Sequence, residues 1–264
     1  MPATTATSGE ANPFLKQLAS SNRKTRDQAL ESLRTYLQRP AAFDELDFLK
    51  LWKGLFFCMW MSDKPLTQQR LARDLADLVH VVKSKENFLG FVQAFWLTMA
   101  REWGGIDALR MDKFLYLVRC YLNRGFERVS RRGWSDDALC DQYLHILELV
   151  PLNTDDPKVP HGLRFHVIDI YVDELDKVDT KRDVPLEKVI SPMEKLSKSS
   201  LSKAVRQRAQ AALEDERLHD WRNVHQELDQ SDDGDVVGDG HQEHQRQARG
   251  SAAGEEDEFG GFDD

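Results

Sequence analysis

The sequence predicts an all-α protein, a HEAT-like array or α-solenoid of roughly nine to eleven helices followed by a disordered acidic C-terminal tail. Apolar residues recur at spacings of three and four in window after window, and short polar turns separate these windows. No window shows the alternating, β-branched pattern of strands. A compact helical bundle is the alternative, because the helix pairs recur at irregular spacings and share no consensus. Long helices with two apolar sides favour a stack, in which inner helices are covered by both neighbours.

The array is organised around residues 48–65, FLKLWKGLFFCMWMSDKP, which hold seven consecutive apolar residues from Leu55 to Met61. A helix here has two apolar stripes, so it needs packing partners on two sides. The run is too short to span a bilayer, which takes about 20 apolar residues. Asp63 is expected to cap the next helix, with Pro65 in its first turn.

The other helices are placed by their apolar spacing and by their end signals. Asn12 and Pro13 open a short first helix, and a second ends before Pro40. Ser84 and the run 135–137 supply further N-caps. The later helices are expected over 66–82, 84–104, 107–122, 135–149, 161–175, 185–196 and 201–213. Gly104 and Gly105 suit a left-handed helix end, and Ser191-Pro192 is expected to kink or split its helix.

Composition divides the chain into three parts: a disordered N-terminus at 1–11, a helical domain at 12–228 and an acidic disordered tail at 229–264. Residues 231–264 hold eleven acids and two arginines, which equals the whole net charge of −9, so the rest of the chain is neutral. The acidic pI therefore does not argue against nucleic-acid binding. Phe259 and Phe262 in the tail are either anchors for a partner or part of a solubilising segment.

Three cysteines, Cys58, Cys120 and Cys140, lie far apart inside apolar helical stretches and form no Cys-x-x-Cys pair. This arrangement favours reduced thiols over disulfides or a zinc site. The N-terminus shows no basic region followed by an apolar one, so no signal peptide is expected. The sequence therefore predicts the cytosol or the nucleus.

Motifs for catalysis are missing from the sequence. It has no phosphate-binding glycine loop, no nucleophile elbow and no His-Glu-x-x-His. We expect no enzyme activity, cofactor, metal or small-molecule substrate. The alternative is a metal-dependent RNase built on Asp173, Glu174 and Asp176. These three residues are more simply the solvated face of an amphipathic helix.

Basic residues give a stronger signal. In RCYLNRGFERVSRR, residues 119–132, five arginines face a single acid, Glu127, and alternate with aromatic residues. Arginine beside aromatic rings suits phosphate contact and base stacking. The candidate RNA-facing residues are Arg119, Arg124, Arg128, Arg131 and Arg132. In the opposing interpretation, their stems cover apolar surface and their charges pair with acids of adjacent helices. Residues 181–208 and 23–39 are also locally basic.

Several long strings together resemble one family. They are LWKGLFFCMWMSDKPLTQQRLARDLADLV, FVQAFWLTMAREWGGIDALRMDKFLYLVR, GLRFHVIDIYVDEL and VPLEKVISPMEKLSKSS. The chain is similar, from about residue 12 to about residue 213, to the nucleolar ribosomal RNA-processing protein 1 family, also called the nucleolar protein 52 type. The resemblance implies an all-α, HEAT-like protein of the nucleus and nucleolus. It implies a role in large-subunit (60S) precursor maturation and rRNA processing, with pre-60S assembly factors as partners.

The resemblance brings no catalytic residues. It implies that Trp52, Trp60, Asp63, Lys64 and Pro65 define the fold, with Asp63 and Lys64 exposed for contact. Many animal members carry a long lysine-rich extension where this chain has a short acidic one, so import with a partner is expected. The leading hypothesis is a non-catalytic scaffold that contacts precursor rRNA and no membrane. A cytoplasmic helical adaptor is a third possibility, disfavoured because no basic amphipathic end helix or lipidation motif is present.

Overall fold

A computed structural model describes residues 13–232, and within them every regular element is helical. The predicted all-α fold is therefore confirmed. The α-helices are α1 (Pro13–Leu18), α2 (Arg23–Leu37), α3 (Glu45–Trp60), α4 (Pro65–Ala76), α5 (Leu78–Val81), α6 (Lys85–Glu102), α7 (Ala108–Val129), α8 (Asp137–Leu149), α9 (His161–Val178), α10 (Leu186–Ser199), α11 (Lys203–Leu213) and α12 (Glu216–Asp232). A 3-10 turn, η1 (Trp103–Gly105), lies between α6 and α7.

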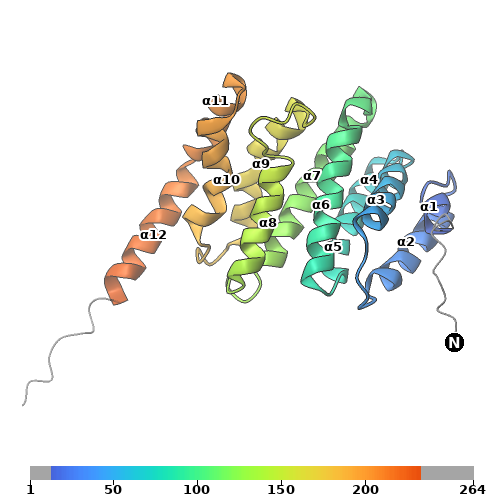
Figure 1. The fold of residues 1–264 in the computed structure, drawn as a ribbon, viewed down its shortest axis with the longest axis horizontal. Coiled ribbons are helices and arrows are strands. Elements are labelled where there is room, and N and C mark those ends of the chain that lie inside the picture. Colours follow the sequence, from blue (N-terminus) through green and yellow to red (C-terminus); the bar gives the residue numbers. More distant parts are fainter. Residues whose placement is uncertain (1–12, 233–264) are drawn as a thin grey trace, which may run out of the picture.

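The helices form antiparallel hairpins that stack side by side into an elongated array (Figure 1). The first row contains α1, α3, α6, α8 and α10, and each of these helices contacts the next in the row. The second row contains α2, α4 with α5, α7, α9 and α11, and it is continuous in the same way. This two-row stack agrees with the predicted HEAT-like array and not with a compact bundle.

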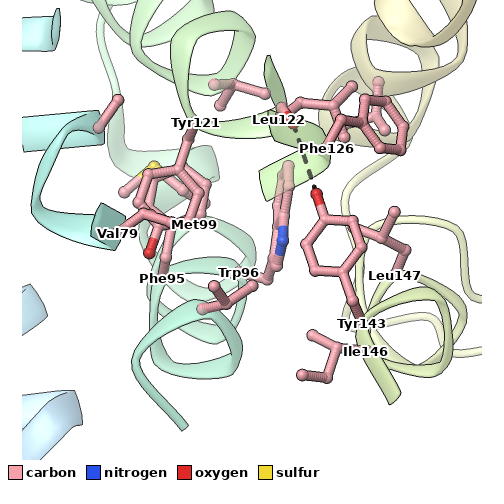
Figure 2. Close-up of a cluster of buried hydrophobic side chains, with 14 of the residues drawn as sticks. Val79, Phe95, Trp96, Met99, Tyr121, Leu122, Phe126, Tyr143, Ile146 and Leu147 are labelled. Carbon is pink, nitrogen blue, oxygen red and sulfur yellow. Dashed lines mark hydrogen bonds between the residues drawn. The ribbon is translucent and has the colours of Figure 1, made fainter. Parts of the chain in front are cut away.

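The core is rich in aromatic side chains where α3, α6 and α7 meet. Trp52 is fully buried, and its ring lies 4.8–5.2 Å, centroid to centroid, from those of Phe91, Phe95 and Tyr121. Figure 2 shows Phe95 and Tyr121 together with Tyr143, which donates a 3.5 Å hydrogen bond to the Leu122 carbonyl. Burial of these large rings is the main stabilising contribution at the centre of the stack.

In four second-row helices, a polar side chain near the helix start bonds to the connection within its own hairpin. The donor is the fourth helical residue in α2, α4, α9 and α11, and it bonds to carbonyls of the turn or loop that precedes its own helix. The pairs are Arg26 with Ser20 and Ser21, Gln68 with Ser62, Arg164 with Asp156, and Arg206 with Ser200 and Leu201. These bonds satisfy carbonyls of the connecting segments, which have no place in a helical ladder. The chain therefore has a structural repeat that its spacing in sequence does not reveal.

The helix starts are partly as predicted. The side chains of Ser84, Asp107 and Asp136 accept hydrogen bonds from the first turns of α6, α7 and α8. The predicted cap at Asp63 is wrong, because Lys64 is the N-cap residue of α4 and makes no side-chain cap bond. Pro65 does occupy the first helical position, where its missing N–H costs nothing.

Three helix interruptions also differ from expectation. The segment 66–82 is divided at Asp77 into α4 and α5. Pro192 lies inside α10, which continues from Leu186 to Ser199, so of the two expected effects, a kink or a split, the split is wrong. Gly104 and Gly105 belong to the 3-10 turn, and Gly133 is the only glycine with a positive φ in the described part.

The helix α12 was not predicted. It continues to Asp232, beyond the expected boundary at residue 229, and it buries Leu218 and Trp221. The predicted disorder of 1–11 and the greater part of the predicted tail lie outside the described residues. None of the helices between residues 13 and 232 has the length and apolar composition needed to cross a membrane.

All three cysteines are free. Cys58 and Cys140 are buried, and burial raises the pKa of Cys58 to about 12 and that of Cys140 to about 11. Both therefore remain protonated and unreactive at neutral pH.

Candidate nucleic-acid interface

Two of the five candidate arginines join α7 to its neighbours in the second row. The Arg119 guanidinium bonds to Asp173 (3.2 Å) and Glu174 (2.7 Å) of α9. Arg124 bonds to Asp77 (2.6 Å), which lies between α4 and α5, and to Glu127 (2.7 Å) of its own helix. These contacts match the interpretation in which the arginines pair with acids of adjacent helices.

Arg128 has a related structural role at the end of α5. Its Nη2 donates to the carbonyls of Val82 (3.4 Å) and Lys83 (3.3 Å). Its guanidinium carbon lies 5.6 Å from the centre of the Phe88 ring. A cation at a helix C-terminus is favoured by the exposed carbonyls there, so Arg128 fixes the turn between α5 and α6.

The remaining two arginines, Arg131 and Arg132, are exposed in the turn between α7 and α8. Arg131 donates from Nη2 to Nδ1 of His80 (2.8 Å), and the other ring nitrogen of His80 bonds to Glu127 (3.2 Å). Burial lowers the pKa of His80, so its ring is neutral at pH 7 and can accept from Arg131. His80 thus positions Arg131 without neutralising its charge.

Arg132 borders a hollow of about 530 Å³ between the α7–α8 turn and the α9–α10 turn. Lys181 lines the opposite side, and the buried Trp134 lies beneath. Asp183 also lines the hollow, and its hydrogen bond with Asp179 raises the pKa of the Asp183 carboxyl. We call Lys83, Arg131, Arg132 and Lys181 the basic edge, because all four are exposed in the turns that lead from second-row to first-row helices.

The backbone of the basic edge has an unusual conformation. Arg132 (φ +61°), Gly133 (φ +66°) and Trp134 (φ +58°) are consecutive left-handed residues, and Arg182 (φ +59°), in the α9–α10 turn, is a fourth. Each non-glycine residue in this conformation costs on the order of 1–2 kcal/mol. Trp134 is held by burial, and Arg182 by its stacking at 4.1 Å over Trp221. Packing therefore fixes a strained turn that presents Arg132 to solvent.

This geometry predicts opposite effects of glycine at two exposed positions. The variant Arg132→Gly should be about 1 kcal/mol more stable than Arg132→Ala, because glycine adopts a positive φ without strain. Lys50, inside α3, provides the matched comparison. There the Lys50→Ala variant should be about 1 kcal/mol more stable than Lys50→Gly, because glycine is a poor helix former. Denaturant unfolding of the four variants measures both differences. Alanine being the more stable residue at both positions would contradict the left-handed turn.

The carboxylates of the alternative RNase site are all engaged in ion pairs. Asp173 bonds to Arg119 and to Arg217 (2.9 Å), and although burial opposes ionisation, these arginines lower the pKa of Asp173. The buried Glu174 bonds to Arg119 and Lys177, and Asp176 bonds to Arg182 at 2.7 Å. Within residues 13–232 no group of three or more His, Cys, Asp or Glu side chains is arranged to hold a metal ion.

Asp63 and Lys64 are exposed in the α3–α4 turn, as expected. This turn leads from the first row to the second, so it lies on the edge of the stack opposite to the basic edge (Figure 1). Trp60, next to it, is half-buried with Arg110 4.7 Å from its ring centre. The structure therefore places the two groups of candidate residues in separate regions.

The sequence interpretation missed Lys83 and His80 as members of the candidate interface. They lie about 50 residues before Arg131, and only the contact between α5 and α7 brings them together. Lys181 was noted within the basic region 181–208, but its position facing Arg132 depends on the pairing of two turns. No signal in the local sequence indicates that these residues lie close together in the fold.

The comparisons with known proteins agree on one family. The family model described as nucleolar protein, Nop52, matches residues 9–262. Human ribosomal RNA processing protein 1 homolog B is 43% identical over 173 residues, which cover 64% of this chain and 23% of the human protein. Mouse homolog A is 44% identical over 168 residues (62% of this chain, 34% of the mouse protein). The Caenorhabditis elegans homolog is 34% identical over 176 residues (65% and 44%). The chain thus spans less than half the length of these relatives.

Proposed function

The chain belongs to the Nop52 family of nucleolar proteins, and from this premise we propose that it is a non-catalytic ribosome-assembly factor. It acts as a helical scaffold in maturation of the large (60S) subunit precursor and in rRNA processing, in the nucleolus. Its partners are other pre-60S assembly factors and precursor rRNA. The names of its relatives, ribosomal RNA processing protein 1 homologs, support this role.

The observation that carries the scaffold role is the use of charged side chains between hairpins. Arg119 and Arg124 each bond to a carboxylate contributed by the neighbouring hairpin. Arg208 of α11 likewise bonds to Asp169 of α9 at 2.5 Å. Residues that could have served chemistry instead hold the stack together, and half-buried networks of this kind rigidify a structure. A rigid stack with two long faces suits the simultaneous binding of several partners.

The same observation weakens the alternative of a metal-dependent RNase. A divalent ion at Asp173, Glu174 and Asp176 would have to displace Arg119, Arg182 and Arg217 from their carboxylates. Displacement of Arg119 would also remove the ion pairs between α7 and α9. The structure therefore gives this activity no support.

For contact with RNA we propose the basic edge, rather than all five arginines of residues 119–132. Arg119, Arg124 and Arg128 make intramolecular bonds, whereas Arg131, Arg132, Lys83 and Lys181 present charge to solvent from adjacent turns. Helices in neighbouring hairpins lie about 10 Å apart. Cations at this spacing fit the phosphates of a nucleic-acid backbone, whose contact is mainly electrostatic.

The test is the double charge reversal Arg131→Glu with Arg132→Glu. Affinity for precursor rRNA should fall about tenfold or more at physiological salt, because two phosphate contacts are lost. The slope of log affinity against log salt should fall by about 1.5 for the same reason. The matched control is Lys16→Glu with Lys50→Glu, two exposed lysines of α1 and α3 in the first row. Thermal unfolding checks that both variants retain the fold.

Sedimentation of the same variants with pre-60S particles separates the parts of the proposal. Wild-type RNA affinity and salt slope in the Arg131/Arg132 variant would remove the basic edge as the RNA site. Failure of the wild-type protein to sediment with pre-60S particles would overturn the assembly role itself. Metal-dependent RNA cleavage by the purified protein would overturn its non-catalytic character.

A further inference from the structure

A groove with an apolar floor crosses the first row of helices. It has a volume of about 570 Å³, and its floor combines Leu49 of α3, Leu97 and Ala100 of α6, and Leu149 at the end of α8. Leu149 is 45% exposed, so it presents apolar surface to solvent beside the other floor residues. The loop residue Val159 closes one end. The groove therefore offers apolar surface on three consecutive hairpins.

Two of the three charged residues that line the groove are basic. Arg101 and Lys158 line it and are exposed, and Asp156 is the only acid among its lining residues. Lys53 follows Leu49 by one helical turn, so it lies on the same face of α3 and is also exposed. Arg101 bonds to Glu102 but keeps 48% of its side chain exposed. An apolar floor with a basic rim fits a ligand that combines large apolar groups with acidic ones.

The chain itself contains such a segment. Residues 255–264 read EEDEFGGFDD, with six acids, no base and two phenylalanines three positions apart. We propose that this segment docks in the first-row groove, with Phe259 and Phe262 against the apolar floor. The flanking carboxylates then face Arg101, Lys158 and Lys53. Gly260 and Gly261 add no side chain between the two rings.

The connecting chain is long enough for this docking. Twenty-six residues lie between Asp232 and Phe259, and an extended chain spans up to about 90 Å over the 27 steps from one to the other. Two helix steps of about 10 Å separate α10 from α6 in the first row, and α12, with 17 residues, adds about 25 Å. The reach therefore exceeds the path even when the direction of α12 is unfavourable.

This docking goes beyond the scaffold role, because partner binding to the first-row face would then depend on whether the segment occupies the groove. An acidic segment in the groove would exclude a partner protein that uses the same apolar residues. It would also leave the basic edge, which lies in the second-to-first-row turns, available to RNA. The segment would thus control protein contacts at the groove without changing RNA contacts at the basic edge.

The experiment uses a fluorescein-labelled peptide of residues 254–264 and the full chain carrying Phe259→Ala and Phe262→Ala. Fluorescence anisotropy should show binding to this chain, and a peptide with both phenylalanines replaced by alanine should bind at least tenfold more weakly. The wild-type chain should also bind the labelled peptide at least tenfold more weakly, because its own segment competes at a high effective concentration. Equal binding of the two peptides would overturn the proposal, as would equal binding to the two chains.

Variants of the groove locate the site. In the chain with alanine at 259 and 262, Leu149→Asp or Arg101→Glu should reduce peptide affinity at least tenfold. The control Leu66→Asp, at a leucine that is 82% exposed in α4, should leave it unchanged. An effect of Leu66→Asp equal to that of Leu149→Asp would place the peptide elsewhere and overturn the assignment. In the wild-type chain, the segment competes with the labelled peptide. If this competition increased with protein concentration, the segment would be docking on a second copy, and docking within one chain would be overturned.

Discussion

Replacement of Trp52 by alanine is expected to lower the free energy of unfolding by about 3–5 kcal/mol, the usual range for emptying a large aromatic site. Its ring contacts Phe91 of α6 and Tyr121 of α7 and is fully buried. Its Nε1 donates a 3.0 Å hydrogen bond to the Phe91 carbonyl, which would lose this partner. The helices α3, α6 and α7 meet at this side chain, so few of its neighbours can move to fill the cavity left by alanine.

Urea denaturation of the wild-type and Trp52→Ala proteins measures this loss. Trp52→Phe serves as the control, since it keeps a ring between α3 and α6 and should lose clearly less. A loss below 1 kcal/mol for Trp52→Ala would contradict the inward position of this side chain.

Replacement of Gly125 by alanine is expected to destabilise the protein by about 2–3 kcal/mol, although alanine is the better helix former. A Cβ at this position in α7 would lie 2.1 Å from the Tyr143 hydroxyl oxygen and 2.5 Å from its Cζ. Tyr143 is buried among aromatic and aliphatic side chains (Figure 2), so its ring has little room to move. The missing side chain at Gly125 is what lets the Tyr143 hydroxyl approach the Leu122 carbonyl.

Thermal or denaturant unfolding tests this effect against Gly104→Ala. A Cβ at Gly104 would have no neighbour within 4 Å, so that variant should be neutral or slightly more stable. Equal stability of the Gly125→Ala and Gly104→Ala variants would mean that Tyr143 does not pack against α7 as described.

The helices and several of their ends could be predicted because the signals are local. Ser84, Asp107 and Asp136 cap helices from within three residues, and apolar spacing identifies each buried stripe. The helix α12 was missed because its sequence is mostly polar. Leu218 and Trp221, spaced by three, were the signal that could have revealed it.

The candidate interface could be predicted only in part, because charge alone does not distinguish a paired arginine from one that faces solvent. Arg119 and its partner Glu174 are 55 residues apart, and Arg124 and Asp77 are 47 apart. Such pairs depend on which helices become neighbours in the fold, and the local sequence does not indicate this. The exposed pair Arg131 and Arg132 was in the predicted set, but nothing in the sequence separated it from the other three arginines.

The hairpins closed by Arg26, Gln68, Arg164 and Arg206 have a consequence for distances along the molecule. Because each hairpin is fastened internally and contacts only its neighbours, every step along the stack adds one helix width, about 10 Å. The distance between two points on the stack is therefore fixed by the fold. A ligand in the groove over α3, α6 and α8 and an RNA strand at the turns after α5, α7 and α9 would be kept at a fixed separation, because the same three hairpins carry both sites.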